Sequence, residues 1–212
     1  TNEFQSMAKT PLLVAMDAEW GLAMRLDSVY AFPWNMTLGA LKDNALVEQT
    51  GKHIAQHCKR LGVHIDFAPD IDINTNPKNP IIGNRSFGES KFNVAQKGVA
   101  LTKGMQSVGV LACGKHFPGH GDTEKDSHKT LPTVSFSRER LESTEFYPFQ
   151  QLISAGVASL MVGHLNVPAL DEGKPTSISY KVVSGLIKQQ MGFQGLIFSD
   201  SLGMKGVADY AE

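Results

Sequence analysis

Residues 115–128, KHFPGHGDTEKDSH, gather three of the chain's seven histidines together with two aspartates, a glutamate, two lysines and two glycines. A packed core does not use such groups, and a plain surface loop does not need the histidines. In an extended loop alternate side chains point the same way, so Asp126 can accept a hydrogen bond from one imidazole nitrogen of His128. That bond would fix the tautomer and leave the other nitrogen to give or take a proton. The segment therefore predicts an acid/base, His128, oriented by Asp126.

His116 and His120 raise the alternative of a metal site, because they lie four residues apart. That spacing brings two imidazoles to one metal ion on a helix, and Pro118 and Gly119 prevent a helix here. We therefore expect no metal ion and no other cofactor. Lys115 and His116 close an apolar strand, so we expect their side chains to reach over the end of a sheet.

Asp200 is a carboxylate at the end of another apolar run, GLIFSD (195–200). In that position it is a candidate nucleophile, although it could also cap the helix-like residues that follow. An ionised nucleophile beside a separate acid/base is the arrangement of retaining glycoside hydrolysis. His164 also ends a strand-like run, and it is either a site residue or a histidine whose hydrogen bonds are satisfied by the protein. Arg85 lies in an Asn- and Pro-rich loop from which it could reach a ligand hydroxyl.

The elements that must position these residues alternate along the chain. Nearly continuous apolar runs predict strands, at residues 12–17, 64–69, 109–116, 157–164 and 195–200. The stretches between them predict helices, at residues 41–61, 92–108, 138–155 and 177–191. Strand–helix alternation predicts a parallel sheet with right-handed crossovers, and thus an α/β protein.

Each of the five predicted strands ends in polar or charged residues, as Asp17 does after the first. Active sites form at that end of the strands in a (β/α)8 barrel, whereas an open doubly wound sheet uses few strands at a switch point. No G-x-G-x-x-G or P-loop follows the first strand, which weakens a nucleotide-binding interpretation. We therefore expect about five of the eight strands of a (β/α)8 TIM-type barrel, with residues 1–212 as one partial catalytic domain. Its two open edges predict self-association.

Composition excludes several classes of protein. The net charge of −1 gives no basic footprint for nucleic acid, and 42% hydrophobic and 19% charged residues are ordinary for a globular domain. No apolar run approaches the roughly 18 residues of a membrane span. The first ten residues do not resemble a signal peptide, and Cys58 and Cys113 do not indicate a disulfide. Neither observation decides between the bacterial cytoplasm and the periplasm.

The segment KHFPGHGDTEKDSHKTLP (115–132) resembles the signature of the β-N-acetylglucosaminidase branch of family 3 glycoside hydrolases. FAPDIDINTNPKNPIIGNRSFG and GLIFSDSLGM are similar to further segments of that family, and the resemblance extends over essentially the whole chain. It implies that Asp200 is the nucleophile and that His128 is the acid/base, oriented by Asp126. It also implies a set of residues that bind hydroxyls of the non-reducing sugar or lie close to it: Asp17, Arg85, Lys115, His116 and His164.

The resemblance implies a (β/α)8 barrel whose third to seventh strands are present here, and a retaining exo-β-N-acetylglucosaminidase acting on cell-wall-type glycans through a covalent glycosyl-enzyme. Two residues depart from the family pattern. Trp20 stands where the family has a glycine, with a face that could stack on a sugar, and Ser201 stands where many relatives have a second aspartate. Two alternatives stay open: a β-glycoside phosphorylase of the same family, and an inactive sugar-binding fragment of the barrel.

Overall fold

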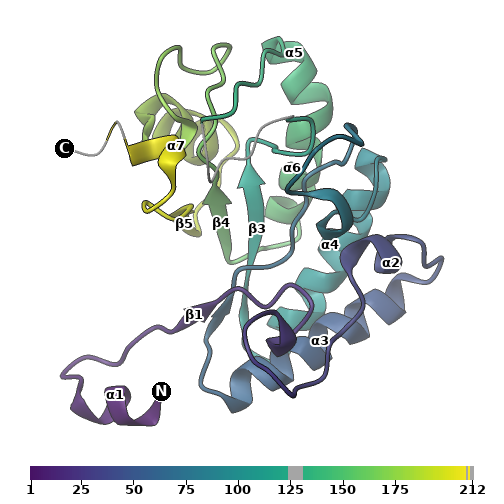
Figure 1. Ribbon diagram of the computed structural model, residues 1–212, viewed down its shortest axis with the longest axis vertical. Coiled ribbons are helices and arrows are strands. Elements are labelled where there is room, and N and C mark those ends of the chain that lie inside the picture. The colour runs from purple at the N-terminus through teal and green to yellow at the C-terminus, as the bar shows by residue number, and fades with distance from the viewer. Residues whose placement is uncertain (124–130, 209, 211–212) are drawn as a thin grey trace.

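The computed structural model describes residues 1–123, 131–208 and 210, and it contains one sheet of five parallel strands (Figure 1). The strands follow one another in chain order across the sheet, and they are β1 (Ala15–Met16), β2 (Ile65–Asp66), β3 (Leu111–Phe117), β4 (Ser159–Val162) and β5 (Leu196–Ser199). Each strand is parallel to its neighbour. The predicted parallel α/β architecture is therefore confirmed, although β1 and β2 are shorter than the apolar runs that indicated them.

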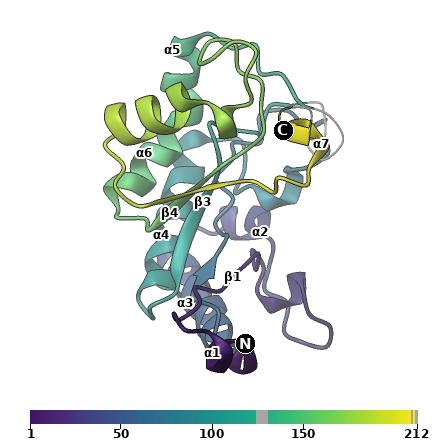
Figure 2. The same ribbon diagram turned by 90° about the vertical axis from the view of Figure 1, so that its left-hand side faces the viewer.

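Helices connect consecutive strands, and in Figure 2 the long ones lie together along one side of β3 and β4. They are α3 (Asn44–Arg60), α4 (Lys91–Gln106) and α6 (Phe146–Ser154), with α5 (Arg138–Arg140) and the π-helix η3 (Leu141–Glu145) leading directly into α6. Asp43 and Ser90 cap α3 and α4 by accepting hydrogen bonds from the Ala45 and Asn93 amides. None of the described helices is long and apolar enough to cross a lipid bilayer.

The fourth predicted helix begins later than the sequence pattern indicates. Residues Thr176–Ile178 form a single 3₁₀ turn, η4, and the π-helix η5 runs over Lys181–Gln190. Ser179 separates the two because its backbone is extended, and its hydroxyl accepts a hydrogen bond from the Val182 amide at 3.2 Å. The remaining short helices are α1 (Asn2–Met7), η1 (Leu22–Met24), α2 (Asn35–Gly39), η2 (Gly83–Arg85) and α7 (Lys205–Ala208).

The sheet curls into half a barrel. Phe67, just after β2, and Phe198 of β5 pack edge to face with ring centroids 5.1 Å apart, although β3 and β4 separate their strands in the sheet. Between the sheet and the helices lies a core of buried side chains that includes Ile54, Leu101 and Phe149. This curvature is what part of a (β/α)8 barrel requires. Among the described strands β1 and β5 each pair on one side only, so self-association through these edges stays a prediction.

The two cysteines lie in this core and are not bonded to each other. Cys58 on α3 and Cys113 on β3 are both fully buried with free thiols. Burial is the largest influence on each thiol, and it raises the pKa of each to about 12. Both groups are therefore neutral packing residues.

Candidate active site

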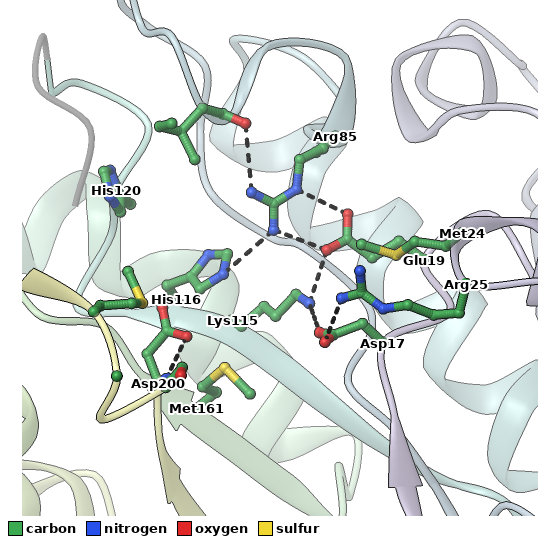
Figure 3. Close-up of a pocket in the computed structure, with 14 residues that line it drawn as sticks. Asp17, Glu19, Met24, Arg25, Arg85, Lys115, His116, His120, Met161 and Asp200 are labelled. Atoms are coloured by element: carbon green, nitrogen blue, oxygen red, sulfur yellow. Dashed lines mark hydrogen bonds and ion pairs between the residues drawn. The ribbon is translucent and has the colours of Figure 1, made fainter. Parts of the chain in front are cut away.

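The carboxyl ends of the strands meet around a cavity of about 590 Å³ (Figure 3). Side chains from the ends of β1, β3 and β5 line it, including Asp17, Lys115, His116 and Asp200, and Arg85 enters from η2. The structure therefore brings together five of the residues that the sequence predicted for the site. The cavity has the size of an ordinary small-ligand pocket.

Lys115 is the buried cation at the centre of the cavity, with only 1% of its side chain exposed. Its Nζ lies 2.9 Å from Asp17 Oδ1 and 2.7 Å from Glu19 Oε1. Burial alone would lower the pKa of Lys115, but these two carboxylates outweigh that effect and raise the pKa above its usual range. Asp17 also accepts a hydrogen bond from Arg25 Nη2 at 2.7 Å, and its own pKa is lowered by both cations against the opposing effect of burial.

Arg85 is bound by the same buried glutamate. The Nε and Nη2 groups of Arg85 donate to the two carboxylate oxygens of Glu19, at 3.0 and 2.8 Å, which is a bidentate pair. Glu19 therefore links the two cations, and they lower its pKa although burial opposes them. Glu19 was not among the residues predicted from the sequence for this site. The signal was its spacing from Asp17, since residues two apart in an extended segment after a strand face the same way.

His116 is a neutral ring held between the carboxylate of Asp72 and the guanidinium of Arg85. Its Nδ1 donates to Asp72 Oδ2 at 2.8 Å, because a carboxylate can only accept. Its Nε2 therefore carries a lone pair, which faces Arg85 Nη2 at 3.4 Å. Burial, followed by the charge of Arg85, lowers the pKa of His116 to about 4. The ring is thus uncharged at neutral pH.

One group of described residues has the geometry to hold a metal ion. Asp70, Asp72 and His116 each place a potential ligand atom within 4.8 Å of the others. Arg85 Nη2 lies 3.4 Å from Asp70 Oδ2 and also 3.4 Å from the His116 ring, so a cation entering this group would meet a fixed positive charge. The absence of a metal from the chemistry stays a prediction.

Asp200 follows β5 and reaches the cavity on the side away from Glu19 (Figure 3). Its amide donates to Val162 O at 2.9 Å, and its Oδ1 accepts from the Ser201 amide at 2.8 Å. Burial acts to raise the pKa of Asp200, but the charge that the His116 ring carries once it is protonated in acid, together with the Ser201 hydrogen bond, lowers that pKa overall. The carboxylate is therefore ionised at neutral pH, as a nucleophile must be.

His164 follows β4, but its side chain is directed into the protein. The residue is fully buried and is not among those that line the cavity. Its Nδ1 lies 2.6 Å from Ser177 Oγ and its Nε2 lies 2.9 Å from the carbonyl oxygen of Ser201. A sugar hydroxyl could bond this ring only if one of those two contacts opened.

Comparison with known proteins identifies the architecture around this cavity. The family model for the N-terminal domain of glycosyl hydrolase family 3 matches residues 1–212. The chain belongs to glycosyl hydrolase family 3. Beta-hexosaminidase A of Pseudoalteromonas piscicida is 35% identical over an alignment of 223 positions, which covers 97% of this chain and 37% of that relative.

Two solved structures resemble the chain along nearly its whole length. A β-N-acetylglucosaminidase from Paenibacillus sp. FPU-7 has a TM-score of 0.95 and 40% identity, over 99% of this chain and 41% of that one. NagZ from Neisseria gonorrhoeae, in complex with N-trifluoroacetyl-D-glucosamine, has a TM-score of 0.86 and 33% identity, over 95% of this chain and 61% of that one. The chain therefore spans less than two thirds of the length of each of these relatives.

The first residues of the segment 115–132 are held in place by hydrogen bonds and close backbone packing at His120 and Gly121. Asp72 Oδ1 accepts a hydrogen bond from the His120 amide at 2.6 Å, and Asn79 Nδ2 donates to His120 O at 2.7 Å. A Cβ on Gly121 would lie 1.9 Å from Ile73 O, so only glycine allows this approach of the two backbones. The predicted acid/base His128 and its orienting residue Asp126 lie outside the described residues.

The aromatic residue that departs from the family pattern packs on another tryptophan. The Trp20 ring lies 4.0 Å from the Trp34 ring, centroid to centroid, with 31° between their planes. Trp20 is not among the residues that line the cavity. The predicted stacking of Trp20 on a sugar stays a prediction.

Proposed function

We propose that this family 3 protein is a retaining exo-β-N-acetylglucosaminidase that removes terminal N-acetylglucosamine from cell-wall-type glycans, as in peptidoglycan recycling. The observation that carries the proposal is an ionised carboxylate, Asp200, at the edge of a cavity whose opposite side holds a fixed network of ion pairs. Such a cavity offers both hydrogen-bond donors and acceptors to a neutral sugar. The names of the relatives support an amino-sugar substrate.

In this proposal the charged groups of the cavity bind hydroxyls of the non-reducing sugar. They are Asp17, Arg85, Lys115 and His116. Asp17 retains 31% side-chain exposure, and the neutral His116 ring lines the cavity with its Nε2 beside Arg85 Nη2. Because neighbouring side chains already fix these groups, little reorganisation is needed when the sugar arrives. The sugar contact predicted for His164 would need a change in its hydrogen bonds.

The reaction would proceed in two displacements. One carboxylate oxygen of Asp200 attacks the anomeric carbon while the glycosidic bond breaks, and His128, oriented by Asp126, gives its proton to the departing oxygen. The neutral His128 then takes a proton from water, whose oxygen attacks the anomeric carbon and releases the Asp200 carboxylate. The first step transfers the proton of His128 to the alcohol product, and the second step returns a proton from water to His128.

The test is to replace and to label Asp200 in the natural protein that carries these residues. Asp200→Ala should lower the turnover of an aryl N-acetylglucosaminide by about 10⁴-fold or more, as loss of a covalent nucleophile does in other enzymes. A 2-fluoro sugar with a good leaving group should label Asp200 covalently, as read by peptide mass spectrometry. Asp27→Ala, an exposed aspartate that does not line the cavity, is the control and should behave as wild type.

Labelling of Asp17 or Asp72 in place of Asp200 would contradict the assignment. Product analysis in phosphate buffer separates hydrolysis from the phosphorylase alternative, which would release a sugar 1-phosphate. Unchanged substrate at every protein concentration would favour the inactive sugar-binding alternative.

A further inference from the structure

We infer that His164 is a positioning residue for the nucleophile. It acts through its hydrogen bond to Ser201, and the Ser177 hydroxyl selects the tautomer of His164 that can make that bond. The inference rests on the proposed role of Asp200. It assigns to His164 a task different from contact with the sugar, and it gives Ser177 a place in the mechanism.

The hydrogen bonds around His164 allow one arrangement of protons when the ring is neutral. The Ser201 carbonyl oxygen can only accept, so Nε2 carries the hydrogen and donates across 2.9 Å. Nδ1 then has a lone pair and accepts from the Ser177 hydroxyl across 2.6 Å. The Ser177 hydroxyl thus selects the tautomer that can hold Ser201.

Ser177 is fixed relative to His164 by the residue next to it. Thr176 Oγ1 donates to Gly163 O at 2.7 Å and accepts from the Leu165 amide at 3.2 Å, so it bonds to both neighbours of His164 in the chain. The Thr176 amide adds a bond to Leu165 O at 2.8 Å. Thr176 and His164 are both buried. The end of β4 and the turn η4 therefore form one unit that carries the Ser177–His164 pair.

Ser201 connects that unit to the nucleophile. Its carbonyl group accepts from His164, and its amide donates to Asp200 Oδ1 at 2.8 Å. When Ser201 is held, Oδ1 of Asp200 has a fixed donor and Oδ2 is left to attack the sugar. A small rotation of the Asp200 side chain would move that oxygen away from the anomeric carbon. A displacement of about 1 Å can cost about 10²-fold in rate.

The backbone around Asp200 is fixed from both sides along the chain. The Asp200 amide bonds to Val162 O, which fixes the backbone on the near side. The His164 bond to Ser201 fixes it on the far side.

The test compares His164→Leu, His164→Gln and Ser177→Ala in the natural protein, with His53→Leu as a control at an exposed histidine of α3. His164→Leu should lower kcat and the rate of Asp200 labelling by a 2-fluoro sugar by about 10- to 100-fold. The inhibition constant for free N-acetylglucosamine should change by less than about twofold, because sugar binding uses other residues. His164→Gln keeps a donor near the Nε2 position and should recover about tenfold of the loss.

Ser177→Ala removes one hydroxyl from the surface of the unit, so it tests the inference even if His164→Leu fails to fold. It should lower the labelling rate by about threefold to tenfold at unchanged affinity for N-acetylglucosamine. A weaker affinity with unchanged kcat in the His164 variants would make His164 a sugar contact and overturn the inference. Wild-type labelling rates in all three variants would overturn it as well. Failure of the wild-type protein to label at Asp200 would instead contradict the proposed function.

Discussion

The two sides of the cavity are built from different interactions. On one side, which we call the charged half, Glu19, Lys115, Arg85 and Asp17 are joined by ion pairs of 2.7–3.0 Å, and the side chains of Lys115 and Glu19 are 1% and 2% exposed. On the other side, the reaction half, Asp200 is held through Ser201 and His164 by hydrogen bonds. Among the described residues no ion pair within 4.0 Å reaches Asp200.

In the proposed function this difference separates binding from reaction. The charged half is already complete before a sugar enters, so its donors and acceptors are preorganised. A cation bonded directly to Asp200 would stabilise the carboxylate and weaken it as a nucleophile, whereas neutral hydrogen bonds orient it at a smaller cost in reactivity. We therefore expect changes in the charged half to act mainly on sugar affinity, and changes in the reaction half to act mainly on rate.

The largest effect should come from His128, which belongs to the reaction half by its proposed role. A nitrophenolate leaves without a proton, so His128→Ala should still form the glycosyl-enzyme from a nitrophenyl substrate and then stall, because no base activates water. Stopped-flow absorbance should show a burst of nitrophenol followed by slow turnover. A natural sugar leaving group should lose both steps, by about 10² to 10⁴ in rate.

Azide distinguishes this acid/base role from a structural one, because azide needs no deprotonation and should speed the slow turnover of His128→Ala. Asp126→Asn should give a milder form of the same pattern, since it disturbs only the orientation and tautomer of His128. Equal slowing of nitrophenyl and natural substrates, with no burst and no azide effect, would exclude His128 as the acid/base.

Glu19→Gln should break the charged half and leave the reaction half in place. The substitution keeps the shape of the side chain but leaves Lys115 and Arg85 short of one negative charge in a buried site, which costs about 3 kcal/mol in comparable cases. The KM for an aryl N-acetylglucosaminide should rise by about tenfold or more, while the maximal rate of Asp200 labelling should change by less than about threefold. Glu172→Gln, at an exposed glutamate, is the matched control.

An equal loss in KM and in labelling rate would show that the two halves are not separable. Circular dichroism at the assay temperature would confirm that the Glu19→Gln protein is folded when these constants are measured.

An effect on stability, not on activity, should appear at Asp66, which lies on β2 and bonds to the segment that carries the charged half. Its Oδ1 accepts from the Ala18 amide at 2.9 Å, its Oδ2 has no hydrogen-bond partner among the described residues, and burial raises its pKa to about 7. A folded pKa above the unfolded value of 3.8 means that the stabilisation is complete below pH 3.8 and is lost as the pH rises toward 7. Asp66→Asn lacks this loss. The melting temperature of the variant relative to that of wild type should therefore increase as the pH rises from 4 to 8.

The expected gain at pH 8 is about 4 kcal/mol, or roughly 8 to 16 °C for a protein of this size. Differential scanning calorimetry at both pH values measures it, with Asp27→Asn as a control that should show no trend. A constant difference between variant and wild type across this range would mean that Asp66 is already ionised at pH 4.

The sequence was enough to predict the five strands and the end of the sheet at which the cavity lies. Each buried strand is a nearly continuous apolar run, and each ends in a polar residue that a core would not accept, as Asp17 and Lys115 show. The four helix predictions were less accurate at their ends, because a single extended residue such as Ser179 decides where a helix starts. One extended residue does not change the spacing of the apolar positions, so the periodic pattern does not reveal it.

The partners of the site residues could not be predicted in the same way. Glu19 and Arg85 are 66 residues apart in the chain, and Asp17 and Lys115 are 98 apart, so only the curled sheet brings them together. The orientation of the His164 side chain could not be predicted from the sequence either. Its position after a strand suggested the cavity, but the choice between cavity and interior depends on Ser177 and Ser201, whose positions follow from the fold.

The two buried cysteines make the chain suitable for site-specific labelling. With a pKa of about 12, each thiol of Cys58 and Cys113 is ionised in about one molecule in 10⁵ at pH 7, so alkylating reagents should leave both unmodified. A cysteine introduced by Ser135→Cys, at an exposed position, would then be the reactive thiol of the chain. A fluorophore or spin label attached there could report on sugar binding without first removing the native cysteines.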